Sequence, residues 1–259
     1  MTVELASLQA WVGAALWTLA RVSGLVLAAP VFSAVTVPRM VRGGLAVLLT
    51  VVLAPTVAVP AGLAPLSAPG LAVLAQQLLI GAAMGFVLRL VVEAASFGGQ
   101  LVAFAMGLSY GEVVDPLKGV TTPVLSQFYS LLATLLLLAT NAHLRLLDAL
   151  GQSFHELPVG AGVFSSAASW ALLLWAGRLF SGALTLALPA LAALLVVNVG
   201  VAVTSRAAPA LNLFAIGFPA ILLLGLVVLW FTLGSLPGAV ERLFDDAFNA
   251  LSGALAPGH

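Results

Sequence analysis

The sequence predicts an all-α integral membrane protein built from several helices. Of its 259 residues, 62% are hydrophobic and only 7% are charged, whereas about 25% of the residues in a typical soluble domain are charged. Nine basic residues are balanced by nine acidic ones, so the chain lacks the excess of positive charge that nucleic-acid binding uses. The chain has no cysteine, which excludes disulfides, thiol chemistry and cysteine-ligated metals.

The charged residues are so sparse that they separate long apolar runs. No Asp, Glu, Lys or Arg lies between Arg42 and Arg89, or between Arg206 and Glu241. A helix needs about 20 mainly apolar residues to cross a membrane, and proline and glycine mark where such helices end. We therefore expect six candidate spans, at residues 8–29, 43–59, 71–92, 123–140, 168–203 and 211–233. The fifth run is long enough for one helix and part of another.

One stretch, residues 96–122, does not fit a simple span. It contains Gly98-Gly99, three further glycines and Asp115-Pro116, which is too much punctuation for one straight helix. Irregular backbone at membrane depth is tolerated only where it is buried in protein or lines a cavity. We therefore expect this stretch to line a cavity if it lies at that depth.

Two later stretches predict amphipathic helices. Residues 143–162 carry apolar side chains at helical spacing among polar ones, which predicts an amphipathic or re-entrant helix that ends near Pro158. The apolar residues at helical spacing there include Leu144, Leu147, Leu150 and Phe154. The tail after Pro237 is polar and acidic, with two phenylalanines at spacing i, i+4, Phe244 and Phe248. It predicts a short helix at the membrane interface.

The sequence offers little for catalysis. A nucleotide-binding P-loop needs a lysine after its glycines, and the only lysine, Lys118, follows no such turn. His143 and Asp148 could form an acid–base pair, but they follow the end of an apolar run, where polar side chains normally meet water. We expect no enzyme activity and no catalytic, cofactor-binding or metal site, with an intramembrane hydrolase as one alternative.

Three arginines, Arg21, Arg178 and Arg206, lie within or beside apolar runs, where a charge is costly. They could belong to an ion or proton pathway. We favour the alternative that their helices face water or other subunits, or that the side chains extend to the interface. The acidic residues that could pair with them are Glu93, Glu112, Asp115 and Glu156.

Small and polar residues within the runs predict close contacts between helices. Gly81 and Gly85 form a G-x-x-x-G motif, a spacing that lets membrane helices approach closely without showing which helix is the partner. Four polar side chains either hydrogen-bond across helices or lie at water-facing helix ends: Gln76, Gln77, Asn198 and Asn212.

Several motifs resemble those of one known family. M-G-L-S at residues 106–109, followed by Asp115-Pro116, resembles the signature of the FliR/SctT family of type III export-gate membrane proteins. R-V-S-G at residues 21–24, N-A-H-L at 141–144 and L-N-L-F-A-I-G-F-P at 211–219 resemble further motifs of the family in the expected order. The last motif is the most specific, and the resemblance covers nearly the whole chain. Ala142 stands where the family usually has glycine.

The resemblance implies a non-enzymatic core subunit of the flagellar type III export gate, which secretes unfolded flagellar proteins. It implies a multi-pass protein of the bacterial inner membrane in the flagellar basal body, surrounded by membrane lipid and by the partners FliP, FliQ and FlhB. It also implies one membrane domain, residues 1–259, in which a FliP-like part (about 1–177) precedes a FliQ-like hairpin and polar tail (about 178–259). In the assembly, the helices would be raised out of the bilayer plane.

The family's plug loop maps onto about residues 106–123, the stretch already singled out as irregular. The expected plug residues are Met106, Gly107, Leu108, Ser109, Gly111, Asp115, Pro116 and Gly119. These residue types suit a gate, because hydrophobic constrictions close by dewetting, methionine is adaptable and glycine lets the backbone bend. Candidate contacts to other subunits are Gly81, Gly85, Arg206, Asn212, Phe218 and Pro219.

Two alternatives to the flagellar gate subunit remain besides the hydrolase. A secondary solute transporter would use broken helices to build a binding site at the bilayer midplane. The sequence shows no inverted repeat and no carboxylate placed for ion coupling, which counts against this reading. The other alternative is the equivalent subunit of an injectisome export gate, and the M-G-L-S form favours the flagellar one.

Overall fold

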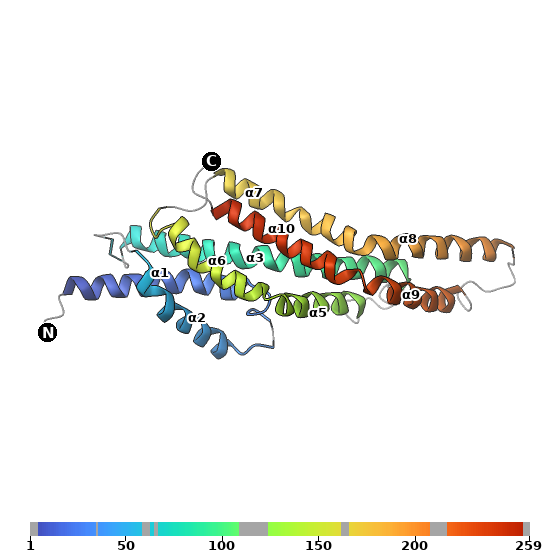
Figure 1. The fold of residues 1–259 in the computed structure, drawn as a ribbon, viewed down its shortest axis with the longest axis horizontal. Coiled ribbons are helices and arrows are strands. Elements are labelled where there is room, and N and C mark those ends of the chain that lie inside the picture. The colour runs from blue at the N-terminus through green and yellow to red at the C-terminus, as the bar shows by residue number, and fades with distance from the viewer. Residues whose placement is uncertain are drawn as a thin grey trace. The chain divides into compact units, whose positions relative to one another are not determined.

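The computed structural model describes residues 5–34, 36–58, 63–64, 67–108, 124–161, 166–207 and 217–255, with side chains from Trp11 onward. Every element in these ranges is a helix (Figure 1). In chain order they are α1 (Leu5–Ala28), α2 (Arg39–Leu53), the short 3-10 helix η1 (Ala54–Thr56), α3 (Ala68–Ala105), α5 (Val124–Ala139), α6 (Ala142–Glu156), α7 (Ser166–Ala176), α8 (Arg178–Ala207), α9 (Phe218–Leu233) and α10 (Leu236–Leu255). The predicted all-α class is confirmed.

Several of these helices are long and apolar enough to cross a membrane. Within the described ranges, four stretches qualify by length and composition: Trp11–Ala28, Arg39–Thr56, Ala68–Ala105 and Ser166–Ala207. The number rises to six if the bent pairs α5–α6 and α9–α10 each count as one span. The chain is therefore a multi-helix integral membrane protein, as predicted.

The expectation that residues 96–122 are irregular throughout is wrong for residues 96–105, which continue α3 without interruption. The glycine doublet lets neighbouring helices come close instead of ending the helix. A Cβ at Gly99 would lie 2.6 Å from the carbonyl oxygen of Leu125, and one at Gly98 would lie 3.0 Å from that of Ala183. Residues 109–123 lie outside the described part of the chain.

The chain forms two compact units. The first contains Met1–Leu90, Asn141–Ala176 and Asp245–His259, and the second contains Val91–Thr140 and Gly177–Phe244. Helices α3 and α10 each contribute residues to both units. The division into a FliP-like part (1–177) and a FliQ-like part (178–259) stays a prediction.

In the first unit, α1 and the N-terminal part of α3 run side by side in the same direction (Figure 1). A Cβ at Gly81 would collide with the carbonyl oxygen of Arg21, and one at Gly85 would lie 2.6 Å from the amide nitrogen of Ala29. The close packing predicted from the G-x-x-x-G motif is therefore found within the chain, against α1. A role of Gly81 and Gly85 in contacts to another subunit stays a prediction.

Arg21 is completely buried in the first unit and joins α1, α3 and α6. Its Nε donates to Gln77 Oε1 at 2.8 Å, and its Nη2 donates to the same oxygen. Its Nη1 donates to the carbonyl oxygen (2.7 Å) and the hydroxyl (3.0 Å) of Ser153, and Nη2 also donates to the carbonyl oxygen of Leu157 at 2.7 Å. The guanidinium carbon lies 4.1 Å from the centre of the Phe154 ring. Ser153 and Leu157 lie at the C-terminal end of α6, where the helix dipole is negative and favours a cation.

This arrangement corrects the expectation for Arg21. In the part of the chain that the structure describes, its partners are neutral oxygens and an aromatic ring, not a carboxylate. Two of the expected acidic partners, Glu112 and Asp115, lie outside the described residues. The side chain also does not face water or lipid, because it is fully enclosed by this unit. Arg178 and Arg206, by contrast, are exposed at the two ends of α8.

The two helices predicted for residues 143–162 and for the tail are present as α6 and α10. The buried positions of α6 are Ala142, Leu146, Leu150, Ser153 and Phe154. Of the apolar residues named from the sequence, Leu150 and Phe154 lie on this buried face, whereas Leu144 is 53% exposed and Leu147 is half-buried. The predicted short helix of the tail is the 20-residue helix α10, in which Phe244 and Phe248 are both buried.

Replacing Arg21 by lysine should destabilise the protein. A lysine ammonium is a single point charge and cannot reproduce the planar fork that reaches three residues. We expect Arg21→Lys to lower the free energy of unfolding by roughly 1–3 kcal/mol, the usual effect of leaving buried acceptors unpaired. Denaturant unfolding of the detergent-purified protein, followed by tryptophan fluorescence, measures this change.

Arg145→Lys is the matched control, because Arg145 also lies over a phenylalanine ring, at 4.2 Å from the centre of Phe248. Its side chain is 49% exposed and forms a 2.8 Å ion pair with Asp245. Pairs of this kind contribute about 0–1 kcal/mol, so the control should lose little stability. An equal loss in the two variants would contradict the stabilising role of Arg21.

Candidate functional site at the turn after α3

The end of α3 is a well-defined turn built around Gly107. The amide of Leu108 donates to the carbonyl oxygen of Ala103, and the amide of Gly107 donates to that of Phe104, both at 3.0 Å. With a φ of 76° at Gly107, this pair of bonds is the Schellman motif that closes many helices. Glycine suits this position because it adopts a positive φ without steric cost. The turn therefore fixes where the helix stops and the next segment begins.

A polar side chain from α8 supports the same turn. Asn198 Nδ2 donates to the carbonyl oxygen of Ala105 at 3.1 Å, one of the last carbonyls of α3, which have no partner within the helix. Asn198 lies one turn beyond Leu194, a fully buried residue of α8. Of the two alternatives for this asparagine, a bond across helices is therefore the one observed, as it is for Gln77.

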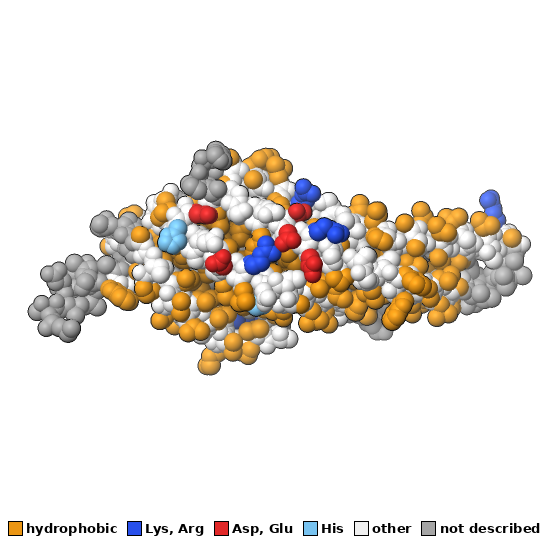
Figure 2. Space-filling model, viewed as in Figure 1, with side chains coloured by type: hydrophobic (Ala, Val, Ile, Leu, Met, Phe, Trp, Pro, Cys, Tyr) orange, Lys and Arg blue, Asp and Glu red, His pale blue; other side chains and the backbone are white. Residues whose placement is uncertain are grey.

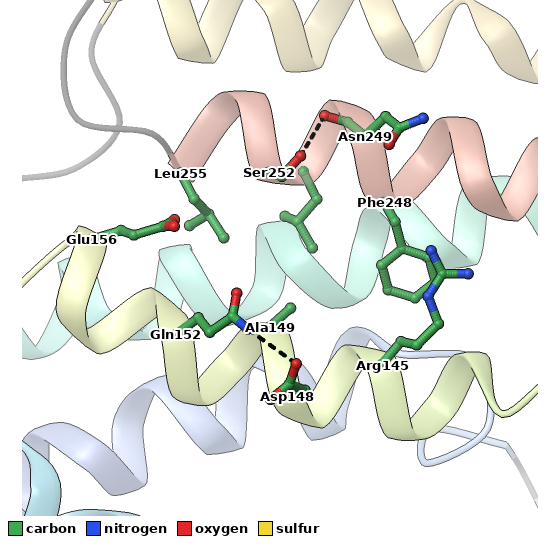
Figure 3. Close-up of a pocket in the computed structure, with 10 residues that line it drawn as sticks. Arg145, Asp148, Ala149, Gln152, Glu156, Phe248, Asn249, Ser252 and Leu255 are labelled. Atoms are coloured by element: carbon green, nitrogen blue, oxygen red, sulfur yellow. Dashed lines mark hydrogen bonds between the residues drawn. The ribbon is translucent and has the colours of Figure 1, made fainter.

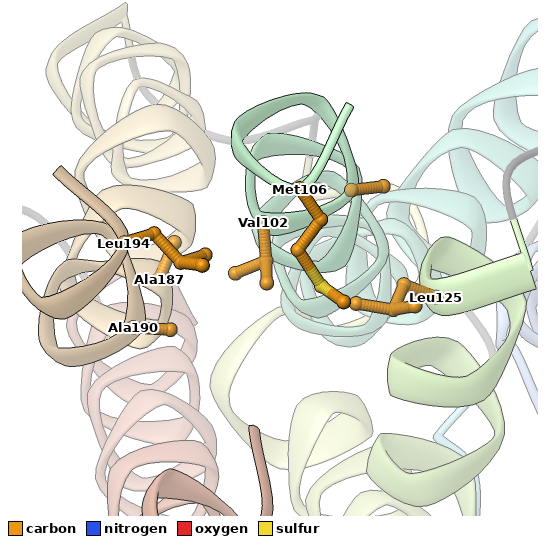
Figure 4. Packing of buried hydrophobic residues seen from close by; sticks show 7 residues of the cluster. Val102, Met106, Leu125, Ala187, Ala190 and Leu194 are labelled. Carbon is orange, nitrogen blue, oxygen red and sulfur yellow. The ribbon is translucent and has the colours of Figure 1, made fainter. Parts of the chain in front are cut away.

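Met106 is fully buried at this turn, in a cluster of apolar side chains from α3, α5 and α8 (Figure 4). The buried members are Val102, Ala103, Met106, Leu125, Ala187, Ala190 and Leu194. In Figure 4 the Met106 side chain points toward Leu125, which lies in the first turn of α5. Partly buried residues of α9, among them Leu222 and Leu229, complete the cluster.

Glycine at position 225 leaves room for Met106. A Cβ at Gly225 would lie 2.6 Å from Cε, 2.8 Å from Cγ and 3.1 Å from Sδ of Met106. Neither Gly225 nor Leu125 stood out in the sequence, because an isolated glycine or leucine in an apolar run carries no pattern. Only the three-dimensional structure shows that they meet the same methionine.

The predicted site residues divide into described and undescribed ones. Met106, Gly107 and Leu108 form the turn, whereas Ser109, Gly111, Asp115, Pro116, Gly119 and Asn212 lie outside the described residues. Phe218 and Pro219 begin α9, where proline is well tolerated because the first turn of a helix needs no amide donor. Arg206 is in the last turn of α8, near the negative end of that helix.

The first unit carries a groove between α6 and the C-terminal part of α10, with a volume of about 280 Å³ (Figure 3). Its lining includes two carboxylates, Asp148 and Glu156, and apolar side chains, among them Phe248 and Leu255. Charged side chains gather over α6 and α10, on a surface that is elsewhere mostly apolar (Figure 2). Because charges are costly in lipid, this face suits water or a protein neighbour.

The arrangement on α6 does not form the acid–base pair considered above. His143 and Asp148 are five residues apart on one helix and therefore lie on different sides of it. Asp148 accepts a hydrogen bond from Gln152 Nε2 at 3.0 Å (Figure 3). Within the described residues, no group of three or more His, Asp or Glu could hold a metal ion.

Comparison with known proteins gives the family. Residues 12–247 match the family described as bacterial export proteins, family 1. The chain is 36% identical over 243 residues to the flagellar biosynthetic protein FliR of Escherichia coli (strain K12), covering 93% of this chain and 92% of that protein. It is 35% identical over 246 residues to FliR of Pectobacterium carotovorum subsp. carotovorum (95% and 94% covered), and 26% identical over 240 residues to FliR of Bacillus subtilis (strain 168) (91% and 92% covered).

The helices define the class of the protein, a multi-helix membrane protein whose helix α3 ends in a hydrogen-bonded glycine turn. The chain belongs to the bacterial export proteins, family 1, among the FliR proteins. Together with the apolar helices, this makes it a membrane-embedded component of the flagellar export apparatus.

A side chain at position 107 should weaken the turn. Gly107→Ala places a Cβ in the left-handed region, which costs about 1–2 kcal/mol for an ordinary residue, so we expect a loss of unfolding free energy of that size. Gly107→Asn should lose less, because asparagine tolerates this conformation better. Denaturant unfolding of the purified protein measures both changes.

The matched control is Gly200→Ala on α8, where a Cβ would meet nothing within 4 Å. Alanine is the better helix former by about 1 kcal/mol, so this substitution should be neutral or stabilising. A Gly107→Ala protein as stable as the control would show that the turn does not depend on its glycine.

Proposed function

We propose that this chain forms part of the wall of the flagellar export channel and carries its plug, the segment of about residues 106–123. The observation that carries the proposal is the fixed turn at its start. Gly107 ends α3, and Met106 is buried beside the first turn of α5, so the described residues that flank the segment pack together. We call these packed flanking residues the root of the segment. A fixed root suits a loop that projects into a channel, because the ends of the loop are held in place.

The composition of the segment supports closure of a channel. A pore that passes unfolded polypeptide must still hold back ions at rest, and hydrophobic constrictions do so by dewetting. The segment offers apolar residues together with Gly111, Gly119 and Asp115-Pro116, which favour bends and turns. In this proposal, secreted flagellar proteins displace the segment as they pass.

We further propose that the chain acts within an assembly with FliP, FliQ and FlhB in the bacterial inner membrane, at the flagellar basal body. Large apolar residues are exposed on α9, among them Leu223, Trp230 and Phe231, which are 67–78% exposed. Surfaces of this kind suit lipid or apolar protein neighbours. The charged face over α6 and α10 (Figure 2) suits a neighbour other than lipid.

The alternatives are less well supported. The relatives reported above are flagellar by name, which favours the flagellar gate over the injectisome gate and over a solute transporter. The separation of His143 from Asp148 on α6 removes the specific reason to consider a hydrolase.

Deleting residues 108–119 should make the resting membrane leaky to small ions, because the channel would lose its plug. The measurement is the rate at which small anions enter cells of the chain's own host, with the amount of the chain in the membrane determined in parallel. We expect the deletion strain to take up anions well above the wild-type rate, with the chain present in normal amount.

A strain that lacks the whole chain is the control, because without a channel wall there should be no leak. Wild-type uptake in a deletion strain that contains normal amounts of the shortened chain would reject the plug assignment.

Purification of a tagged copy in mild detergent should yield a large complex. Native mass spectrometry should find this chain with several copies of two other small membrane proteins, FliP and FliQ. A monomer or symmetric homodimer that persists across detergents would instead favour a transporter and would make the segment after α3 part of a substrate site.

A further inference from the structure

The side chain of Met106 connects both ends of the proposed plug segment. Met106 is the residue directly after α3, and Leu125 is the second residue of α5. Both are buried in one cluster, and Figure 4 shows the methionine side chain directed at Leu125. A second contact joins the same two helices, since Ser96 and Ser126 are hydrogen-bonded through their hydroxyls at 2.8 Å. The described helices on the two sides of the segment therefore share a contact.

The same methionine also contacts α9. The Gly225 backbone lies so close that even one added carbon would come within 2.6–3.1 Å of three Met106 atoms. Gly225 is the buried residue of α9, whose other described side chains are exposed or half-buried. A glycine in the middle of a helix costs roughly 0.5–1 kcal/mol relative to alanine. In return, the missing side chain leaves a notch in the surface of α9, and the Met106 side chain occupies it.

We propose that Met106 is the positioning residue of the plug, and that its seat against Gly225 holds both ends of the segment to the α8–α9 hairpin. The hydrogen bond from Asn198 to Ala105 ties the same end of α3 to α8. A shift of α9 away from Met106 would then release the root of the segment. This inference rests on the proposed plug function and adds the side chain through which the hairpin controls the plug.

Filling the notch tests the proposal. Gly225→Leu should displace Met106 and raise the resting uptake of small anions by about tenfold or more, as expected for overpacking between residues in direct contact. Gly200→Leu is the matched control, because Gly200 lies on α8 in the same unit and a Cβ there meets nothing within 4 Å. Uptake in the control strain should stay close to the wild-type rate. Equal uptake in the two strains would overturn the proposal.

A compensating substitution makes the test specific to the contact. Met106→Ala should restore much of the seal in the Gly225→Leu background, because the double variant moves volume from one side of the contact to the other and nearly conserves the total. Double-variant uptake equal to that of Gly225→Leu alone would show that the two residues act independently, and the proposal would fail.

A second variant covers the case in which Gly225→Leu does not accumulate in the membrane. Met106→Ala alone removes atoms and leaves the turn at Gly107 unchanged, so we expect normal accumulation with raised anion uptake. A sealed membrane in that strain would overturn the positioning role. Recovery of accumulation in the double variant would support the contact.

The deletion of residues 108–119 separates the two proposals. If the deletion leaks while the Met106 and Gly225 variants remain sealed, the plug stands and its anchoring by Met106 is rejected. If the deletion itself remains sealed, the plug assignment fails, and the positioning role fails with it.

Discussion

The first unit depends on one buried cation that has no carboxylate among its described partners. Burying an isolated charge is very costly, and this chain meets the cost with neutral groups that present oxygen to Arg21 from two directions. The Gln77 amide binds it from α3, and the C-terminal carbonyl oxygens of α6 bind it at the negative end of that helix. Any movement of α6 away from α1 would remove the acceptors of Arg21 Nη1 and one of the two acceptors of Nη2. The arginine therefore holds α6 in place. It also determines that the C-terminal end of α6, and not the N-terminal end, packs against α1.

In both units, several close contacts between helices occur at glycines, because a residue without a side chain lets a neighbour approach. Gly81 and Gly85 admit the backbone of α1, Gly99 admits the backbone of α5, and Gly225 admits the side chain of Met106. In a membrane, where apolar side chains gain little from leaving lipid, such van der Waals contact drives helix association. Packing in this protein is therefore decided at a few small residues more than across broad apolar faces.

Much of the fold follows from the sequence, because composition and run length dominate in a chain with so few charges. The all-α class, the amphipathic α6 and a helix in the polar tail were all predictable. The sequence misled where a pattern has two physical meanings. Gly98-Gly99 looked like a break in a helix but serves close packing within one, and Arg21 invited a search for acidic partners although helix-end carbonyls serve as well. The Met106–Gly225 contact joins residues over 100 positions apart, so no local pattern could have shown it.

The notch at Gly225 also constrains how the family can vary. Since one residue fills the space that the other leaves open, positions 106 and 225 share a nearly fixed volume. A lineage that gains a side chain at position 225 can keep the packing only if position 106 becomes smaller. If position 225 enlarges first, the contact is overfilled; if position 106 shrinks first, a cavity forms. Changes at the two positions should therefore be coupled, leaving covariation between two sites that no local motif connects.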